Sequence, residues 1–376
     1  MRRISWPGVA VVVCVASLAP LAAQPVASAP SATALPAPTK ATASVPVLPR
    51  VVVLATGGTI AGTGATSTTT VGYTVANLGV QTLLEAVPEL KRIAEVRGEQ
   101  VFQIASENMT PQHWLKLAAR VNELLAGRDT DGVVITHGTD TIEETAYFLD
   151  LTVRSDKAVV IVGAMRPSTA LSADGPMNLY NAVLLARSKA AIGKGVLVCL
   201  NDQINAGREV TKTNTSELDT FRTPELGFLG VISGGKPVFY RQPSRRHTRN
   251  SEFGIGSLTD LPRVDIVPAY AGSGRGAVDA AVAAGAKGIV YAGVGDGSIA
   301  LDVRPALAAA RAKGIVVVRS SRVGSGIVAR NGEVNDDAFD FVAADNLNPQ
   351  KARVLLMLAL TRTSDTHAIQ QIFWEY

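Results

Sequence analysis

Short runs of β-branched and apolar residues recur along this 376-residue chain and constrain its fold more than any other feature. A strand that is apolar at successive positions must be buried on both faces, as in a parallel sheet covered by helices. The hydrophobic share of 47% is ample for such a core. Seven runs are predicted strands: VVVLA from Val51, GVVIT from Gly132, AVVIVGA from Ala158, GVLVCL from Gly195, VDIVPAY from Val264, GIVYAG from Gly288 and GIVVVRS from Gly314.

Helical patterns lie between several of these runs. Thr110 followed by Pro111 predicts the start of a helix that ends at Gly127. The sequence TIEE at residues 141–144 matches a capping box, in which a threonine and a glutamate cap the start of a helix reciprocally. Strands that alternate with helices in this way predict an α/β fold with right-handed crossovers.

Residues 240–262 interrupt this alternation with polar residues, glycine, proline and a basic cluster. We interpret residues 241–262 as a linker between two domains, one at residues 50–240 and a smaller one at residues 263–376. The larger N-terminal domain is predicted to contain a mostly parallel, flavodoxin-like sheet. The C-terminal domain is predicted to be a smaller parallel-sheet α/β unit.

The N-terminus has the features of an export signal. A basic start, MRR, precedes an apolar stretch at residues 9–18 and small residues suited to cleavage after about residue 23, or as late as residue 29. The stretch is too short to span a bilayer. Residues 24–49 are rich in Ala, Pro, Ser and Thr, which predicts an extended tether. We therefore expect a periplasmic or secreted protein.

The charge balance argues against nucleic-acid binding. Of 36 basic residues, Arg2 and Arg3 fall in the predicted signal, so 36 − 2 = 34 basic residues face 32 acidic ones and leave +2. A near-neutral chain has no electrostatic reason to bind a polyanion. Cys14 also falls in the signal, which leaves Cys199 in an apolar run. We predict that Cys199 is an inert core thiol and that no intrachain disulfide forms.

Several chemistries lack their sequence signals. GVISGGKP at residues 230–237 has phosphate-loop spacing, but Pro237 stands where a hydroxyl would bind magnesium. GSGRGA at residues 272–277 only weakly resembles a dinucleotide fingerprint and is more simply a glycine-rich loop. The chain has no G-x-S-x-G, no H-E-x-x-H and no cysteine pair. His137 is more simply a strand-end residue bonded to backbone than a catalyst.

Two glycine-flanked threonines follow predicted strands, Thr59 in ATGGTIAG and Thr139 in ITHGTDTIEE. Ligands bind at the carboxyl ends of parallel strands, so the two threonines can share one crevice. A threonine hydroxyl needs a neighbour that takes its proton, for which Asp140 and Lys212 are candidates. A threonine there can also merely cap a helix. The residues alone leave an exported α/β hydrolase and an exported ligand-binding protein open.

Five longer motifs carry a family resemblance: ATGGTIAG, DGVVITHGTDTIEETAYFLDLT, AMRPSTALSADGPMNLYNAV, VTKTNT and LNPQKARVLLMLALT. With them, the chain from about residue 51 to 376 resembles the bacterial periplasmic (type II) L-asparaginases and glutaminase-asparaginases. The resemblance implies an amidohydrolase that converts L-asparagine to L-aspartate and ammonia through a threonine nucleophile. It also implies a homotetramer that needs no metal or organic cofactor.

The resemblance assigns roles to particular side chains. Thr59 matches the nucleophile that attacks the side-chain amide, and Tyr73 matches a tyrosine on a mobile loop, here residues 62–74. Glu333 matches the glutamate that orients this tyrosine from a partner subunit. Backbone N–H groups on the glycine-rich strand ends are expected to stabilise the tetrahedral oxyanion.

A second group of matches concerns the remaining catalytic and substrate-binding residues. Thr139, Asp140 and Lys212 match the second catalytic group. Ser106 and Asp140 match residues that hold the α-carboxylate and α-ammonium of the substrate. A noncatalytic exported amino-acid-binding protein would need such ligand contacts but neither Lys212 nor Tyr73.

Two further substrate-binding positions depart from the commonest asparagine-selective pattern. Glu107 stands where glutamine is frequent, and Ser298 stands where asparagine is frequent. Family members with glutamate and serine there tend to accept glutamine as well. We therefore expect secondary L-glutaminase activity.

Overall fold

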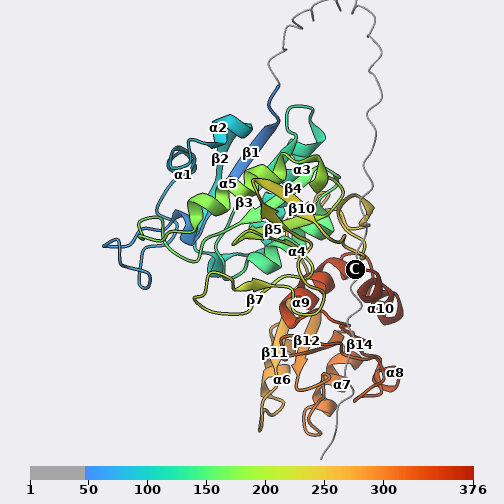
Figure 1. The fold of residues 1–376 in the computed structure, drawn as a ribbon. Helices are drawn as coiled ribbons and strands as arrows, with labels where there is room; N and C mark the ends of the chain where they lie inside the picture. The colour runs from blue at the N-terminus through green and yellow to red at the C-terminus, as the bar shows by residue number, and fades with distance from the viewer. Residues whose placement is uncertain (1–46) are drawn as a thin grey trace, which may run out of the picture. The chain divides into compact units, whose positions relative to one another are not determined.

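The larger sheet has eight strands in the order β10-β9-β6-β5-β4-β3-β1-β2 (Figure 1). Strands β5, β4, β3, β1 and β2 run parallel, and the other three are antiparallel. The strands are β1 (Arg50–Gly57), β2 (Glu95–Ile104), β3 (Gly132–Thr136), β4 (Ala158–Val162), β5 (Val196–Leu200), β6 (Gln203–Ala206), β9 (Gly230–Ser233) and β10 (Lys236–Phe239).

This computed structural model describes residues 47–376, which form one compact unit. The predicted signal peptide and most of the predicted tether lie outside the described residues. Among those described, no helix is long and apolar enough to cross a membrane.

Both faces of the large sheet are buried at its centre, which is why strands β1, β3, β4 and β5 are apolar at successive positions. Along β1, Val52 and Leu54 pack into one core cluster, while Val51 and Val53 pack into another on the opposite face. The helices of this region are α1 (Val80–Glu85), α2 (Leu90–Ile93), α3 (Pro111–Ala126), α4 (Ile142–Thr152) and α5 (Gly175–Ala186).

The smaller sheet is all parallel, in the order β11-β12-β13-β14. Its strands are β11 (Val264–Pro268), β12 (Gly288–Gly293), β13 (Val316–Ser321) and β14 (Val342–Ala343), and its helices are α6 (Gly276–Ala283), α7 (Arg304–Ala312), α8 (Asp336–Phe339), α9 (Pro349–Ala359) and α10 (Thr366–Glu375). Helix α9 lies between the two sheets (Figure 1) and packs on α4. The α/β prediction, with a larger mostly parallel sheet and a smaller parallel one, is confirmed.

The capping box predicted at residues 141–144 is wrong. Helix α4 does begin after Thr141, but the Thr141 side chain makes no cap hydrogen bond. Its hydroxyl instead donates to the carbonyl oxygen of Ser106 at 2.8 Å. Glu144 lies 3.9 Å from Arg353 of α9. Each capping side chain has found a partner in a distant segment.

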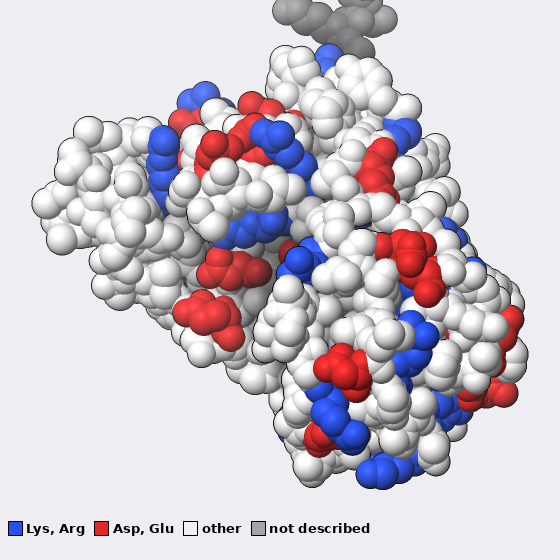
Figure 2. Space-filling view, turned by 90° about the horizontal axis from the view of Figure 1, so that it is seen from below, with Lys and Arg blue, Asp and Glu red and all other residues white. Residues whose placement is uncertain are grey.

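The segment at residues 241–262 is attached to the rest of the protein by ion pairs. Arg241 pairs with Glu209, which follows β6. Arg245 lies 2.6 Å from Asp345 beyond β14. Elsewhere charges are also mixed, and in the view of Figure 2 basic and acidic groups alternate across the face.

Candidate active site

The site is built on the adjacent ends of β1 and β3, which pair in parallel with Ala55 opposite Thr136. Beyond these residues, the segments that follow β1 and β3 contact each other through glycines. A Cβ on Gly58 would lie 2.3 Å from the Cα of Gly138, and Gly58 has a φ of 80°. Only glycine satisfies both conditions. The two strand ends therefore pack as one unit.

Thr59 opens a short 3-10 helix, Thr59–Ala61, directly after this contact. Its side-chain oxygen lies 2.8 Å from the hydroxyl of Tyr73, so the two groups share a hydrogen bond. The loop between them is closed at its base by a bridge between Thr63 and Thr74, with N···O distances of 2.9 and 3.0 Å. This loop folds back so that Tyr73 reaches Thr59.

A second loop holds the Tyr73 loop in place. The Gly64 N–H donates to the hydroxyl of Thr169 at 2.7 Å, and the Ser168 hydroxyl donates to the carbonyl of Gly62 at 2.7 Å. These two residues were not among the predicted site residues. Ser168 and Thr169 belong to the motif AMRPSTALSADGP. The length of this motif was the one feature of the sequence that could have indicated a role for them.

Thr139, Asp140 and Lys212 come together as predicted. Lys212 lies on β7 (Thr211–Lys212), which pairs with β8 (Phe221–Arg222). Its ammonium donates to the Thr139 hydroxyl oxygen at 3.0 Å and to the Asp140 carboxylate at 2.7 Å. A cation that donates to a hydroxyl oxygen favours release of the hydroxyl proton. Thr139 therefore has an activating partner.

Ser106 joins the same cluster from the end of β2. It is buried in a short 3-10 helix, Ser106–Asn108. Its hydroxyl oxygen accepts the backbone N–H of Asp140 at 3.2 Å. Glu107, the next residue, is exposed. The structure thus places Ser106 beside Asp140 and leaves the carboxylate of Glu107 open to solvent.

Ser298 and Glu333 lie apart from this cluster, in the region of the smaller sheet. Ser298 is half-buried after β12, and Glu333 is exposed. Across residues 47–376, neither forms a hydrogen bond or ion pair with Thr59, Tyr73 or Thr139.

His137 is a buried structural residue. Its Nδ1–H donates to the Gly138 carbonyl at 2.8 Å, and its Nε2 lies 2.9 Å from the Thr145 hydroxyl, which accepts Trp114 Nε1–H. The network assigns the proton to Nδ1, because a carbonyl can only accept. Burial lowers the pKa of His137 to about 4. The interpretation of His137 as a backbone-bonded strand-end residue is confirmed.

Cys199 is fully buried in β5 and is a free thiol. Burial raises its pKa to about 12, so the reactive thiolate is suppressed. The described residues hold no group of three or more His, Cys, Asp or Glu side chains that could bind a metal ion.

Two unused backbone donors lie at the strand ends. Within the described chain, the N–H groups of Thr59 and Thr139 donate no hydrogen bond, whereas the N–H of Gly58 donates to Ile104 at 3.1 Å. Free amides beside two activated hydroxyls can receive a developing negative charge. The arrangement can therefore support acyl transfer.

The chain matches two family models, the N-terminal domain of asparaginase at residues 50–245 and the C-terminal domain of glutaminase/asparaginase at residues 263–373. It is 54% identical to L-asparaginase 2 of Escherichia coli (strain K12), with 88% of this chain and 94% of that protein covered. It is 51% identical to the glutaminase-asparaginase of Pseudomonas fluorescens biotype A, with 88% and 91% covered.

The fold is also similar to a solved structure. The probable cytoplasmic L-asparaginase from Campylobacter jejuni superimposes with a TM-score of 0.85 at 50% identity, over 87% of this chain and all of that one. Sequence and structure agree over the whole region that contains both sheets. The chain therefore belongs to the asparaginase/glutaminase family.

Proposed function

We propose that this protein hydrolyses L-asparagine to L-aspartate and ammonia, with secondary activity on L-glutamine. One observation carries the proposal. Two threonine hydroxyls at the ends of adjacent parallel strands each have a separate proton partner, Tyr73 for Thr59 and Lys212 for Thr139. Relatives named for both activities support the same reaction.

Thr59 is the proposed nucleophile. Its hydroxyl oxygen attacks the side-chain amide carbon, and its proton passes toward Tyr73. The negative charge develops on the amide oxygen, where a free backbone N–H from a strand end stabilises it. Ammonia then leaves with a transferred proton, and an ester to Thr59 remains.

Thr139, Lys212 and Asp140 form the second catalytic group. They orient the water that cleaves the ester and restores the Thr59 hydroxyl, while L-aspartate leaves. Ser106 and Asp140 hold the α-carboxylate and α-ammonium ends of the substrate. Glu107 and Ser298 complete that polar end, with Ser298 from a partner subunit.

The proposed assembly is a homotetramer built from intimate dimers. Glu333 and Ser298 make no bond to the cluster of their own chain, and in the proposed assembly a second subunit brings them to it. The proposed location is the periplasm or the exterior, after removal of the predicted signal; one relative is named as periplasmic.

Ammonia release from L-asparagine by the purified protein tests the proposal directly. Thr139→Val should abolish turnover, because valine keeps the β-branched shape and removes only the hydroxyl. Lys212→Met should do the same. Circular dichroism and melting temperature serve as controls for folding.

A folded Thr139→Val or Lys212→Met variant with near-native kcat would eliminate the second catalytic group. A wild-type protein that binds asparagine by calorimetry but releases no ammonia would support a noncatalytic binding protein instead.

A further inference from the structure

Lys351 is a buried charged residue that the proposed mechanism does not use. It lies in the first turn of α9, within the motif LNPQKARVLLMLALT, and only 2% of its surface is exposed. Burying an ammonium group requires compensating partners. The position of those partners indicates what the residue does.

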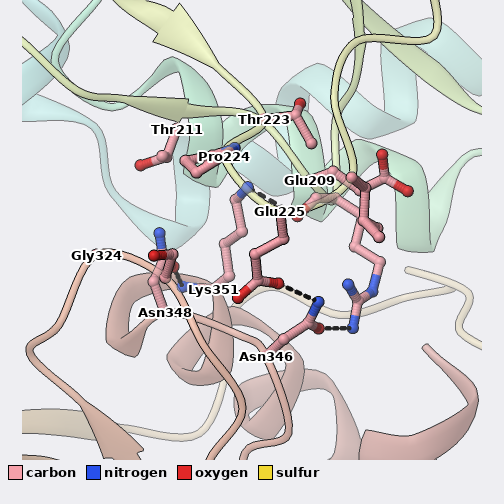
Figure 3. A pocket seen from close by; sticks show the side chains of 12 residues that line it. Glu209, Thr211, Thr223, Pro224, Glu225, Gly324, Asn346, Asn348 and Lys351 are labelled. Atoms are coloured by element: carbon pink, nitrogen blue, oxygen red, sulfur yellow. Dashed lines mark hydrogen bonds between the residues drawn. The ribbon is translucent and has the colours of Figure 1, made fainter. Parts of the chain in front are cut away.

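Two of the partners lie just before Lys212. The Lys351 ammonium donates to the carbonyl oxygen of Arg208 at 2.8 Å and to that of Val210. Figure 3 shows its side chain extending from α9 toward the segment that contains Glu209 and Thr211. Val210 is two residues before Lys212. Lys351 therefore fixes the approach of the chain to β7.

The third partner follows the Thr139–Asp140 pair. Lys351 Nζ lies 4.0 Å from the carboxylate of Glu143, which is buried in the first turn of α4. The same carboxylate accepts Asn348 Nδ2 at 3.0 Å and Gln350 Nε2 at 3.1 Å. The first turn of α9 thus anchors the first turn of α4.

Lys212 and the Thr139–Asp140 pair lie in two separate segments of the chain. Their hydrogen bonds form only if these two segments keep a fixed position relative to each other. Lys351 contacts both of them. We propose that Lys351 is a positioning residue that aligns the Lys212 ammonium with Thr139 and Asp140, an inference that rests on the proposed hydrolase function.

Lys351→Met tests the proposal, because methionine has a similar length and no donors. The expected result is a fall in kcat of at least about tenfold, with KM for asparagine changed by less than about threefold. The alignment of a catalytic group acts on the reaction step rather than on substrate binding, which accounts for this split.

Lys351→Arg is the conservative variant. Its guanidinium keeps the charge and the donors, and a cavity of about 40 Å³ beside Lys351 gives room for the longer side chain (Figure 3). It is expected to recover kcat to within about fivefold of the parent.

Gln350→Met is the matched control. Gln350 lies in the same helical turn and bonds the same Glu143 carboxylate, but it does not bond the segment before Lys212. It should lower the melting temperature and leave kcat within about twofold. Equal losses of kcat in Gln350→Met and Lys351→Met would assign Lys351 a general structural role and overturn the proposal.

Amide hydrogen exchange provides a readout that needs no activity. Lys351→Met should speed exchange at residues 208–213 and at residues 139–144, whereas Gln350→Met should speed it only in the second segment. If the parent releases no ammonia from either amide, the proposed function fails, and the exchange pattern still decides the positioning role. Unchanged exchange at residues 208–213 would refute it.

Glu143→Gln is the second variant if Lys351→Met does not fold. It removes the opposing charge while keeping an acceptor for α9. A two- to fivefold fall in kcat at unchanged KM is expected, and wild-type kcat would contradict the coupling.

Discussion

At the scale of single residues, the buried polar groups around the strand ends decide what each threonine can do. His137 illustrates the point, since the sequence favoured a backbone-bonded strand-end residue over a catalyst, and its ring is bonded to backbone and to Thr145. Its burial also gives the fold a pH-dependent contribution.

The pKa of His137 falls from an ordinary 6.5 to about 4 on folding. The unfolded chain therefore binds a proton between these two values that the folded chain does not. The free energy of unfolding is therefore not reduced by His137 above pH 6.5. It decreases by roughly 3 kcal/mol as the pH falls toward 4. Urea unfolding measures the free energy of unfolding of the parent and of His137→Gln at each pH. Between pH 6.5 and 4 this free energy should decrease less in the variant than in the parent. Parallel pH curves would disprove it.

Substrate choice is the second prediction at this scale. Glutamine is one methylene longer than asparagine, so its polar ends must sit farther from Thr59. Glu107→Gln combined with Ser298→Asn should lower kcat/KM for glutamine more than for asparagine. The change in the ratio of the two values should be about 10- to 200-fold, which is what an enzyme pocket typically gains from one methylene. Equal factors for both amides, or no glutamine hydrolysis by the parent, would refute this explanation of selectivity.

At the scale of elements, most of the parallel strands were predictable because buried strands such as β1, β3, β4, β5, β12 and β13 are apolar at successive positions. Strand β2 was not, because EVRGEQVFQI carries charged residues along an exposed sheet edge. Thr59, Thr139 and Lys212 were predictable from their motifs. The bonds from Ser168 and Thr169 to the Tyr73 loop were not, because the backbone groups they hold have no sequence pattern.

Gly58→Ala tests the contact between the two strand ends. The new Cβ would lie 2.3 Å from Gly138 Cα at a φ of 80°. We expect at least about a tenfold loss of kcat and about 2 kcal/mol or more of stability. Gly193→Ala is the control, since Gly193 has a φ of 71° with nothing within 4 Å. If both variants lose only about 1 kcal/mol and stay active, the contact does not organise the site.

At the scale of the whole molecule, the chain does not bring every predicted site residue together. Ser298 and Glu333 lie on loops of the smaller sheet, where the apolar side chains of Leu301 and Ile327 are 81% and 64% exposed. The role of Ser298 and Glu333 in a neighbouring subunit stays a prediction, which the assembly itself can test.

Mixed oligomers should show whether Glu333 acts across subunits. Thr139→Val and Glu333→Ala are each expected to be inactive alone. After unfolding and refolding together in equal amounts, about a quarter of parental activity should return, because half of the dimers are hybrids with one intact site. No recovery would place Glu333 in the site of its own subunit, and an active monomer in sedimentation would refute the assembly.

The Tyr73 loop has one further consequence, for resistance to proteases. Its exposed stretch, residues 65–72, reads ATSTTTVG and contains no lysine or arginine. Proteases of trypsin-like specificity therefore find no cleavage point there. Val71, 82% exposed, is the large apolar side chain of this stretch that a protease with apolar specificity can recognise. A cut before Val71 would separate Tyr73 from half of its loop while both sheets remained intact, so inactivation and unfolding would become separate events.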